Sequence, residues 1–223
     1  MFLRIGHRGA RAYETENTLE SFERAIASGV NAVELDVRRS RDGRLIVCHD
    51  DNLKRVFGVD LPVHESTLEE MKQATAHRLP ALEEALRLIN GRVEKILVEL
   101  KEEGHEKEVL DLLRKEKLEN RVIIVSFHAG ALARVRELNK KIETGLIYAK
   151  FRNPVEAALN LHARYLLPLY RFVHSKDVEK AHADNLKVIV WTINTKDEAK
   201  KYMAKGVDGI ATDRPDIFSH PDL

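Results

Sequence analysis

The fold is decided by one stretch of the chain, residues 32–48, which reads AVELDVRRSRDGRLIVC. Residues 32–37 and 45–48 have the apolar, β-branched character of strands, and Asp42-Gly43 between them is a strong hairpin signal. A crossover between parallel strands needs a dozen or more residues, whereas seven residues separate Val37 from Leu45. We therefore expect residues 45–48 to return antiparallel to residues 32–37 and to lie outside the main sheet.

Seven further apolar runs alternate with helical patterns along the rest of the chain. These candidate strands are residues 2–6, 95–100, 121–127, 143–147, 165–169, 187–191 and 208–211. Continuous runs such as VIIV at residues 122–125 are typical of strands buried on both faces, as in parallel sheets covered by helices. Between the runs, apolar residues recur at helical spacing, as at Leu82, Leu86 and Ile89. Without the returning strand the chain contains eight β-α units, which predicts an α/β protein with a (β/α)8, or TIM, barrel.

The length and spacing favour one domain over two. The 223 residues come close to the typical barrel size of about 250 residues, and no Pro/Gly/Ser-rich linker or low-complexity segment interrupts the units. We expect residues 1–223 to form a single domain with a short insertion at about residues 38–79, after the second strand. A doubly wound open sheet is the alternative architecture.

Charge and cysteine content exclude several classes of protein. The chain has 37 basic and 36 acidic residues, so no overall field attracts nucleic acid or an anionic membrane. A single cysteine, Cys48, excludes an intramolecular disulfide framework and a four-cysteine zinc site. Arg4 interrupts the N-terminus too early for a signal peptide, and no apolar stretch approaches the roughly 20 residues of a membrane span. We expect a cytoplasmic protein; the sequence leaves its oligomeric state open.

Carboxylates gather where two predicted strands end, which is where barrel active sites form. Residues i and i+2 of a strand face the same side, so Glu34 and Asp36 point together, as do Glu99 and Lys101. Three converging carboxylates are costly to bury without a cation. Oxygen donors favour Mg2+, Ca2+ or Mn2+ over zinc, so we predict Glu34, Asp36 and Glu99 as ligands of one divalent metal ion. The alternative is ordinary charge pairing of Glu34 or Asp36 with Arg38 or Lys101.

Two histidines follow predicted strands and suit proton transfer near neutral pH. His7 follows the first strand and is followed by Arg8-Gly9, where the glycine permits close backbone approach to a ligand. His49 ends the returning strand, with Asp50 next to it to orient its ring. We predict that both histidines flank one substrate.

Three further polar or aromatic residues lie near the ends of the last strands. Trp191 either stacks on the substrate or packs in the barrel, and the sequence leaves both interpretations open. Asp208 and Asp213 are expected to serve turns and helix caps rather than the site.

The sequence resembles the glycerophosphodiester phosphodiesterase family, whose barrel is related to that of phosphatidylinositol-specific phospholipases. The resemblance is carried by motifs in order along the whole chain: GHRGA (6–10), ENT (16–18), VELDV (33–37), DG (42–43) leading to HD (49–50), VELK (98–101), WTIN (191–194) and GVDGIATDRP (206–215). Each motif is weak alone, and their order and spacing are specific. The family's usual alanine-proline before the ENT motif is replaced here by Glu14-Thr15.

The resemblance implies an enzyme of glycerol and lipid metabolism. It implies metal-dependent hydrolysis of a small-molecule glycerophosphodiester to sn-glycerol 3-phosphate and an alcohol. It implies His7 and His49 as the acid/base pair, the three carboxylates above as the metal ligands, and Arg8 and Lys101 as phosphate contacts. Trp191 is a further candidate for substrate binding.

Two other functions remain open from the sequence. A lysophospholipase-D-type enzyme would use the same site and an apolar groove near the insertion, for which the candidate residues are Leu53, Val56, Phe57, Val59 and Leu61. These residues are also expected to form a small core of the insertion itself. A non-catalytic binding module would lack a catalytic histidine or a metal carboxylate, and all of these are present.

Overall fold

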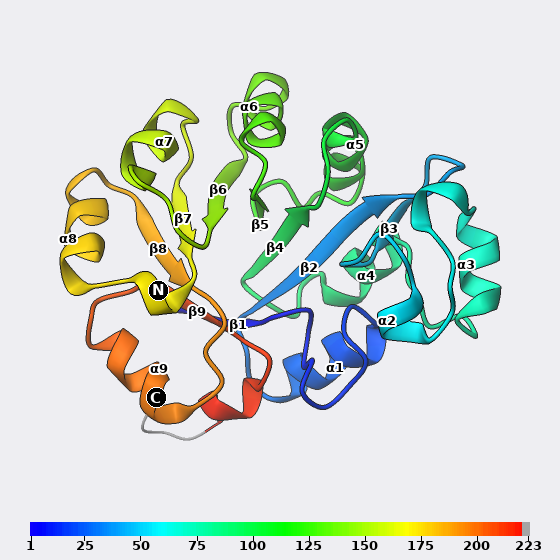
Figure 1. The fold of residues 1–223 in the computed structure, drawn as a ribbon, viewed down its shortest axis with the longest axis horizontal. Helices are drawn as coiled ribbons and strands as arrows, with labels where there is room; N and C mark the ends of the chain where they lie inside the picture. Colours follow the sequence, from blue (N-terminus) through cyan, green and yellow to red (C-terminus); the bar gives the residue numbers. More distant parts are fainter. Residues whose placement is uncertain (220–223) are drawn as a thin grey trace.

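The computed structural model describes residues 1–219, which form a closed barrel of eight parallel strands (Figure 1). The barrel strands are β1 (Leu3–Gly6), β2 (Ala32–Arg39), β4 (Lys95–Leu100), β5 (Val122–Ser126), β6 (Glu143–Tyr148), β7 (Tyr165–Pro168), β8 (Lys187–Val190) and β9 (Gly209–Thr212). β1 pairs in parallel with both β2 and β9, and this pairing closes the barrel. The predicted (β/α)8 barrel is confirmed, and the open doubly wound sheet is wrong.

Helices cover the outside of the barrel between successive strands (Figure 1). The outer helices are α1 (Leu19–Ala27), α4 (Leu82–Ile89), α5 (Glu106–Lys115), α6 (Ala129–Leu138), α7 (Pro154–Asn160), α8 (Ser175–Ala183) and α9 (Lys196–Met203), with 3-10 turns η2 (Tyr170–Phe172) and η3 (Pro215–Phe218). The helical spacing seen in the sequence puts one apolar face of each helix against the strands; in α4, Leu82, Leu86 and Ile89 are buried. No helix within residues 1–219 is both long and apolar enough to cross a membrane.

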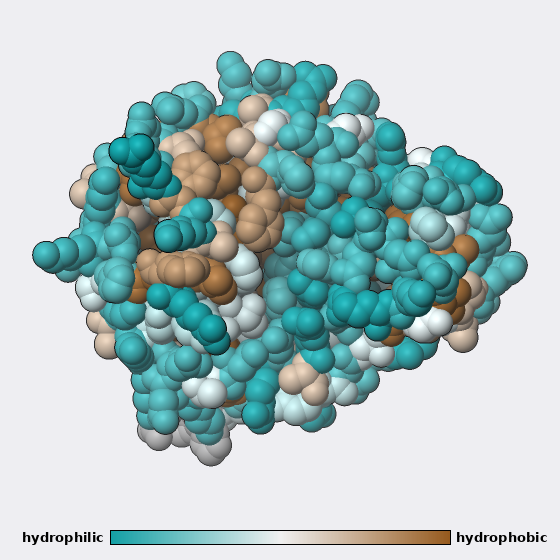
Figure 2. Space-filling view, in the orientation of Figure 1, coloured by the Kyte–Doolittle hydropathy of each residue, from teal (hydrophilic) through white to brown (hydrophobic). Residues whose placement is uncertain are grey.

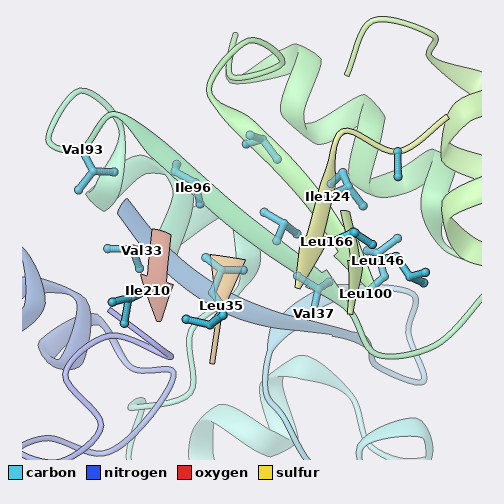
Figure 3. Close-up of a cluster of buried hydrophobic side chains, with 14 of the residues drawn as sticks. Val33, Leu35, Val37, Val93, Ile96, Leu100, Ile124, Leu146, Leu166 and Ile210 are labelled. Atoms are coloured by element: carbon cyan, nitrogen blue, oxygen red, sulfur yellow. The ribbon is translucent and has the colours of Figure 1, made fainter. Parts of the chain in front are cut away.

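Strand alternation sorts the side chains into two sets. Val33, Leu35 and Val37 of β2 point outward and pack with Ile96 and other residues under the helices (Figure 3). The intervening residues of the same strands point into the barrel, whose lower part is filled by apolar side chains such as Ile5 and Ile123. The same alternation turns the polar residues at the strand ends toward the mouth of the barrel.

The segment between β2 and α4 stands beside the barrel (Figure 1). It contains β3 (Leu45–Val47), α2 (Lys54–Phe57), η1 (Val63–Glu65) and α3 (Leu68–Ala74). β3 pairs antiparallel with β2, with Val37 opposite Val47, as the hairpin signal predicts. The segment has its own apolar core, which includes Met71 and Leu79.

Candidate active site

A cavity of about 170 Å³ opens at the carboxyl ends of the barrel strands. Its lining includes all but one of the residues that the sequence predicts for the site, and Asp36 lies next to it. The lining residues are His7, Arg8, Glu34, His49, Leu97, Glu99, Lys101, Val125, Phe127, Ile147, Leu167, Trp191 and Ala211. The cavity has a charged side on β1, β2 and β4 and an apolar side on β5 to β9.

Three buried carboxylates meet on the charged side. Glu34, Asp36 and Glu99 each offer an oxygen, and these oxygens lie within 4.8 Å of one another. Oε1 of Glu34 and Oδ1 of Asp36 are buried and have no hydrogen-bond partner among residues 1–219. Unpartnered carboxylate oxygens that converge in this way are the donor set that a hard divalent cation prefers. The group therefore fits one metal ion.

The pKa values of the three carboxyl groups are shifted because the groups are buried close together. Burial, together with the charges of Asp36 and Glu99, raises the pKa of Glu34 well above its ordinary value. Burial and the charge of Asp36 raise the pKa of Glu99 to about 7. Burial would also raise the pKa of Asp36, but the neighbouring Arg8 and Lys101 hold it below its ordinary value. Without a cation, the protein does not favour three ionised groups here.

Arg8 and Lys101 supply positive charge beside the cluster. Nε of Arg8 lies 3.1 Å from Oδ2 of Asp36, and Nζ of Lys101 lies 2.6 Å from Oε1 of Glu99 and 3.5 Å from Oδ1 of Asp36. The backbone N–H of Arg8 donates to Oε2 of Glu34 over 2.9 Å. The charge-pairing alternative is therefore present for Lys101 with Asp36, but it leaves Oε1 of Glu34 without a partner among residues 1–219.

The loop after β1 is tightly constrained. Gly9 has a φ of +83°, and a Cβ at this position would collide with Ser21. Arg8 also has a positive φ, of 53°, so the chain turns sharply after His7. This turn brings the Arg8 backbone and side chain onto the carboxylates.

Each histidine is held by a carboxylate through the same ring nitrogen. Nδ1 of His7 lies 2.7 Å from Oδ1 of Asp213, and Nδ1 of His49 lies 2.6 Å from Oδ1 of Asp50. Burial lowers the pKa of His49, against the charge of Asp36 and its bond to Asp50. A carboxylate on Nδ1 fixes the orientation of a ring and leaves Nε2 for proton transfer. The predicted partner of His49 is thus found.

Asp213 was predicted to serve a turn, and this prediction is wrong. Besides His7, its carboxylate accepts a bond of 3.0 Å from Nδ2 of Asn194, whose Oδ1 accepts from the backbone N–H of Asp213 over 2.9 Å. Asn194 lies in the WTIN motif and Asp213 in the GVDGIATDRP motif, and these motifs are the signal in the sequence that could have identified the pair. Asp208, by contrast, accepts a hydrogen bond of 2.8 Å from the backbone N–H of Val188 through its Oδ2, which is a structural contact.

Arg55 links the insertion to the barrel and was not identified from the sequence. Its Nε donates to Oδ2 of Asp50 over 2.5 Å, and its two terminal nitrogens contact Glu16 over 2.6 and 3.0 Å. Glu16 also accepts from Arg8 over 2.9 Å. The Arg55 guanidinium therefore connects Asp50, which holds His49, with Glu16, which holds Arg8.

Arg38 does not pair with Glu34, Asp36 or Glu99. Its Nε donates to the backbone carbonyl of His49 over 2.9 Å, and its Nη1 donates to Oε2 of Glu102 over 3.1 Å. This side chain therefore ties the His49 backbone to β2.

Trp191 packs in the barrel and also lines the cavity, while its stacking on a substrate stays a prediction. Its indole N–H donates to the carbonyl of Leu167 over 2.7 Å, and its ring packs against the barrel core. It also lines the cavity and meets Phe127 edge to face at 5.8 Å. Its packing thus holds it in place on the apolar side of the cavity.

From the ion pairs that Glu16 makes with three arginines, we predict that the variant Glu16→Gln is less stable than the wild type and that this difference depends on pH. Although Glu16 is buried, its bonds to Arg55, Arg8 and Arg11 hold its pKa well below the ordinary value. Such a carboxylate stabilises the fold above the pKa of the unfolded state, about 4.3, and the effect is lost as pH falls. We expect the variant to lose about 2 kcal/mol at neutral pH, since bonds to charged groups contribute about 1.5–3 kcal/mol and solvent screens the two exposed arginines.

Urea unfolding of wild type and variant at about pH 7 and about pH 3 measures this effect. The difference in the free energy of unfolding between wild type and Glu16→Gln should be smaller at acid pH than at neutral pH. The control variant Glu14→Gln, which changes an exposed carboxylate, should not differ from the wild type at either pH. A difference that is unchanged between the two pH values contradicts the assignment.

Comparisons with known proteins agree with this geometry. The model of the Glycerophosphoryl diester phosphodiesterase family matches residues 7–217. A glycerophosphodiester phosphodiesterase of Caldanaerobacter subterraneus subsp. tengcongensis is 32% identical, over 96% of this chain and 95% of its own length. One from Bacillus altitudinis is 33% identical, over 95% and 94%.

Solved structures show the same likeness. A Thermotoga maritima glycerophosphodiester phosphodiesterase superposes with a TM-score of 0.82 at 29% identity, covering 98% of this chain and 97% of the other. An Oleispira antarctica phosphodiesterase in complex with the product sn-glycerol-3-phosphate has a TM-score of 0.85 at 29% identity, covering 95% and 93%. With the family model spanning nearly all of the barrel, the chain belongs to the glycerophosphoryl diester phosphodiesterase family.

Proposed function

We propose that this protein hydrolyses small glycerophosphodiesters to sn-glycerol 3-phosphate and an alcohol. The observation that carries the proposal is the pair of carboxylate-held histidines beside three convergent carboxylates in one cavity. The sn-glycerol-3-phosphate bound to the Oleispira antarctica relative supports this substrate class. We further propose that residues 1–223 act as one catalytic domain whose insertion, about residues 38–79, supplies His49.

Glu34, Asp36 and Glu99 would hold one divalent cation, Mg2+, Ca2+ or Mn2+ by the preference of oxygen ligands. When bound, the cation supplies Lewis-acid polarisation of a phosphoryl oxygen. Arg8 and Lys101, already beside the carboxylates, would contact the phosphate oxygens, Arg8 through its planar fork and Lys101 as a point charge.

The histidines would move the protons. Nε2 of His7 accepts the proton of the attacking oxygen, and Asp213 stabilises the imidazolium that forms. Nε2 of His49 donates a proton to the departing alkoxide, while Asp50 holds its ring. Trp191 and Phe127 would form the wall against which the substrate is positioned.

The insertion gives no support to the lysophospholipid alternative. Leu53 is fully buried in the core of the insertion, and Phe57 and Leu61 pack partly buried against the same core. These three residues therefore pack into the insertion itself, as expected for its own small core.

Metal removal should abolish activity. We expect exhaustive chelation to lower turnover of glycerophosphocholine by at least about 100-fold, or about 2.7 kcal/mol, because the cation neutralises the phosphate. Addition of Mg2+, Ca2+ or Mn2+ should restore it. Choline release measures the effect. The variant Glu65→Gln, which changes an exposed carboxylate of the insertion, should respond to chelation and to added metal as the wild type does. Full turnover by metal-free protein would refute the proposal.

The two histidines should differ in their response to the leaving group. His49→Ala should lose about 10²–10⁴-fold on glycerophosphocholine but little on a p-nitrophenyl ester of glycerol phosphate, whose leaving group needs no proton. His7→Ala should lose activity on both substrates, and His64→Ala, an exposed histidine, on neither. Steady-state rates on the two substrates test this, and the reverse pattern would exchange the two roles.

A further inference from the structure

The ring of His49 is held by a carboxylate that is itself held by a residue of the insertion. Nδ1 of His49 lies 2.6 Å from Oδ1 of Asp50, and Oδ2 of Asp50 accepts from Nε of Arg55 over 2.5 Å. Within residues 1–219, these two side chains are the ones that bond to the Asp50 carboxylate. A histidine and an arginine therefore bond to opposite oxygens of one carboxylate, so the orientation of the ring depends on the arginine.

The backbone at His49 is held by different contacts. Nε of Arg38 donates to the carbonyl of His49 over 2.9 Å. The backbone N–H of Cys48 donates to the carbonyl of Asp36 over 3.0 Å. Both contacts join the end of the hairpin to β2 without help from α2. Removal of the Arg55 side chain should therefore release the ring and the carboxylate that holds it, while the chain around them stays in place.

The guanidinium of Arg55 has a second partner, in the loop after β1. Its Nη2 and Nη1 donate to Oε1 and Oε2 of Glu16 over 2.6 and 3.0 Å, and Glu16 is 6% exposed. Oε1 of Glu16 also accepts from Nη1 of Arg8 over 2.9 Å. A planar guanidinium has five N–H donors in a fixed arrangement, so it can bond to two carboxylates at once. The paired bonds to the buried Glu16 fix the direction in which Nε of Arg55 meets Asp50.

The place of these contacts distinguishes Arg55 more than their strength does. Figure 2 shows hydrophilic surface, in teal, between β2 and α2 of Figure 1, and the side chain of Arg55 is 47% exposed. Ion pairs this exposed contribute little to stability. Arg41 is similarly exposed, at 55%, but it pairs with Glu70 inside the insertion. Arg55 instead joins the two parts of the chain that supply His49 and Arg8.

We propose that Arg55 is a positioning residue, which orients His49 through Asp50 for protonation of the leaving alcohol. The inference rests on the proposed phosphodiesterase activity and on His49 as the proton donor. As the P–O bond to the alcohol breaks, Nε2 of His49 gives its proton to the departing oxygen and the ring becomes neutral, with Nδ1–H still bonded to Asp50. Arg55 does not line the cavity, so it acts through its two carboxylate partners.

The variant Arg55→Ala tests this role with two substrates that differ in their leaving group. On glycerophosphocholine, whose leaving alkoxide needs a proton, kcat should fall by about 10²-fold, the cost of a misplacement of about 1 Å. On a p-nitrophenyl ester of glycerol phosphate, kcat should fall by less than about tenfold, through Glu16 and Arg8 alone. The ratio of the two kcat values should therefore fall by about tenfold or more. A loss of folded protein lowers both rates equally and leaves this ratio unchanged.

Two further variants show by which route Arg55 acts. Without the His49 ring there is no proton donor to orient, so adding Arg55→Ala to His49→Ala should not change the ratio further. Arg41→Ala removes an exposed arginine of the insertion that is also paired with a carboxylate, and this matched control should leave the ratio as in the wild type. Urea unfolding of each variant measures how much of the protein is folded in the assay.

The outcomes separate the inference from the proposed function. If His49→Ala shows its dependence on the leaving group while Arg55→Ala leaves the ratio unchanged, the inference is overturned and the proposed function stands. A further fall of the ratio when Arg55→Ala is added to His49→Ala also overturns the inference, because Arg55 then acts by a route that does not include His49. Failure of the metal-loaded wild type to hydrolyse either substrate overturns the proposed function, and the inference with it.

Discussion

Three carboxylates buried within 4.8 Å of one another are the constraint on which the rest of this site depends. Like charges so close in a dry environment are unstable unless opposite charge compensates them. The chain supplies Arg8 and Lys101, yet oxygens of Glu34 and Asp36 remain without hydrogen-bond partners among residues 1–219. The barrel imposes this arrangement, because strand alternation turns all three groups inward, and its closure prevents them from separating.

The two histidines proposed for proton transfer are held from two different sides of the site. His7 is fixed through Asp213, at the last barrel strand, whereas His49 is fixed through Asp50 in the insertion. Arg55 and Glu16 join the insertion to the loop after β1. The two sides of the site are therefore coupled through one ion-pair network centred on the buried Glu16, so the position of the insertion and the geometry around Arg8 depend on each other.

Much of the fold and of the candidate site could be predicted from local sequence signals. Two-residue alternation placed Glu34, Asp36 and Glu99 inward, and the short Asp42-Gly43 connection separated β3 from the barrel. The pairing of His7 with Asp213 joins residues 206 positions apart, and no local pattern encodes such a contact. The apolar residues of the insertion were ambiguous for the same reason, since only the tertiary structure shows that Leu53 is buried in the core of the insertion.

Anomalous diffraction from crystals of this protein equilibrated with Mn2+ would test the metal site most directly. We expect one strong anomalous peak, bounded by carboxylate oxygens of Glu34, Asp36 and Glu99 at about 2.0–2.6 Å, the range of hard cations with oxygen ligands. A peak elsewhere, or an empty cluster still closed by Arg8 and Lys101, would contradict the assignment of these three carboxylates as metal ligands.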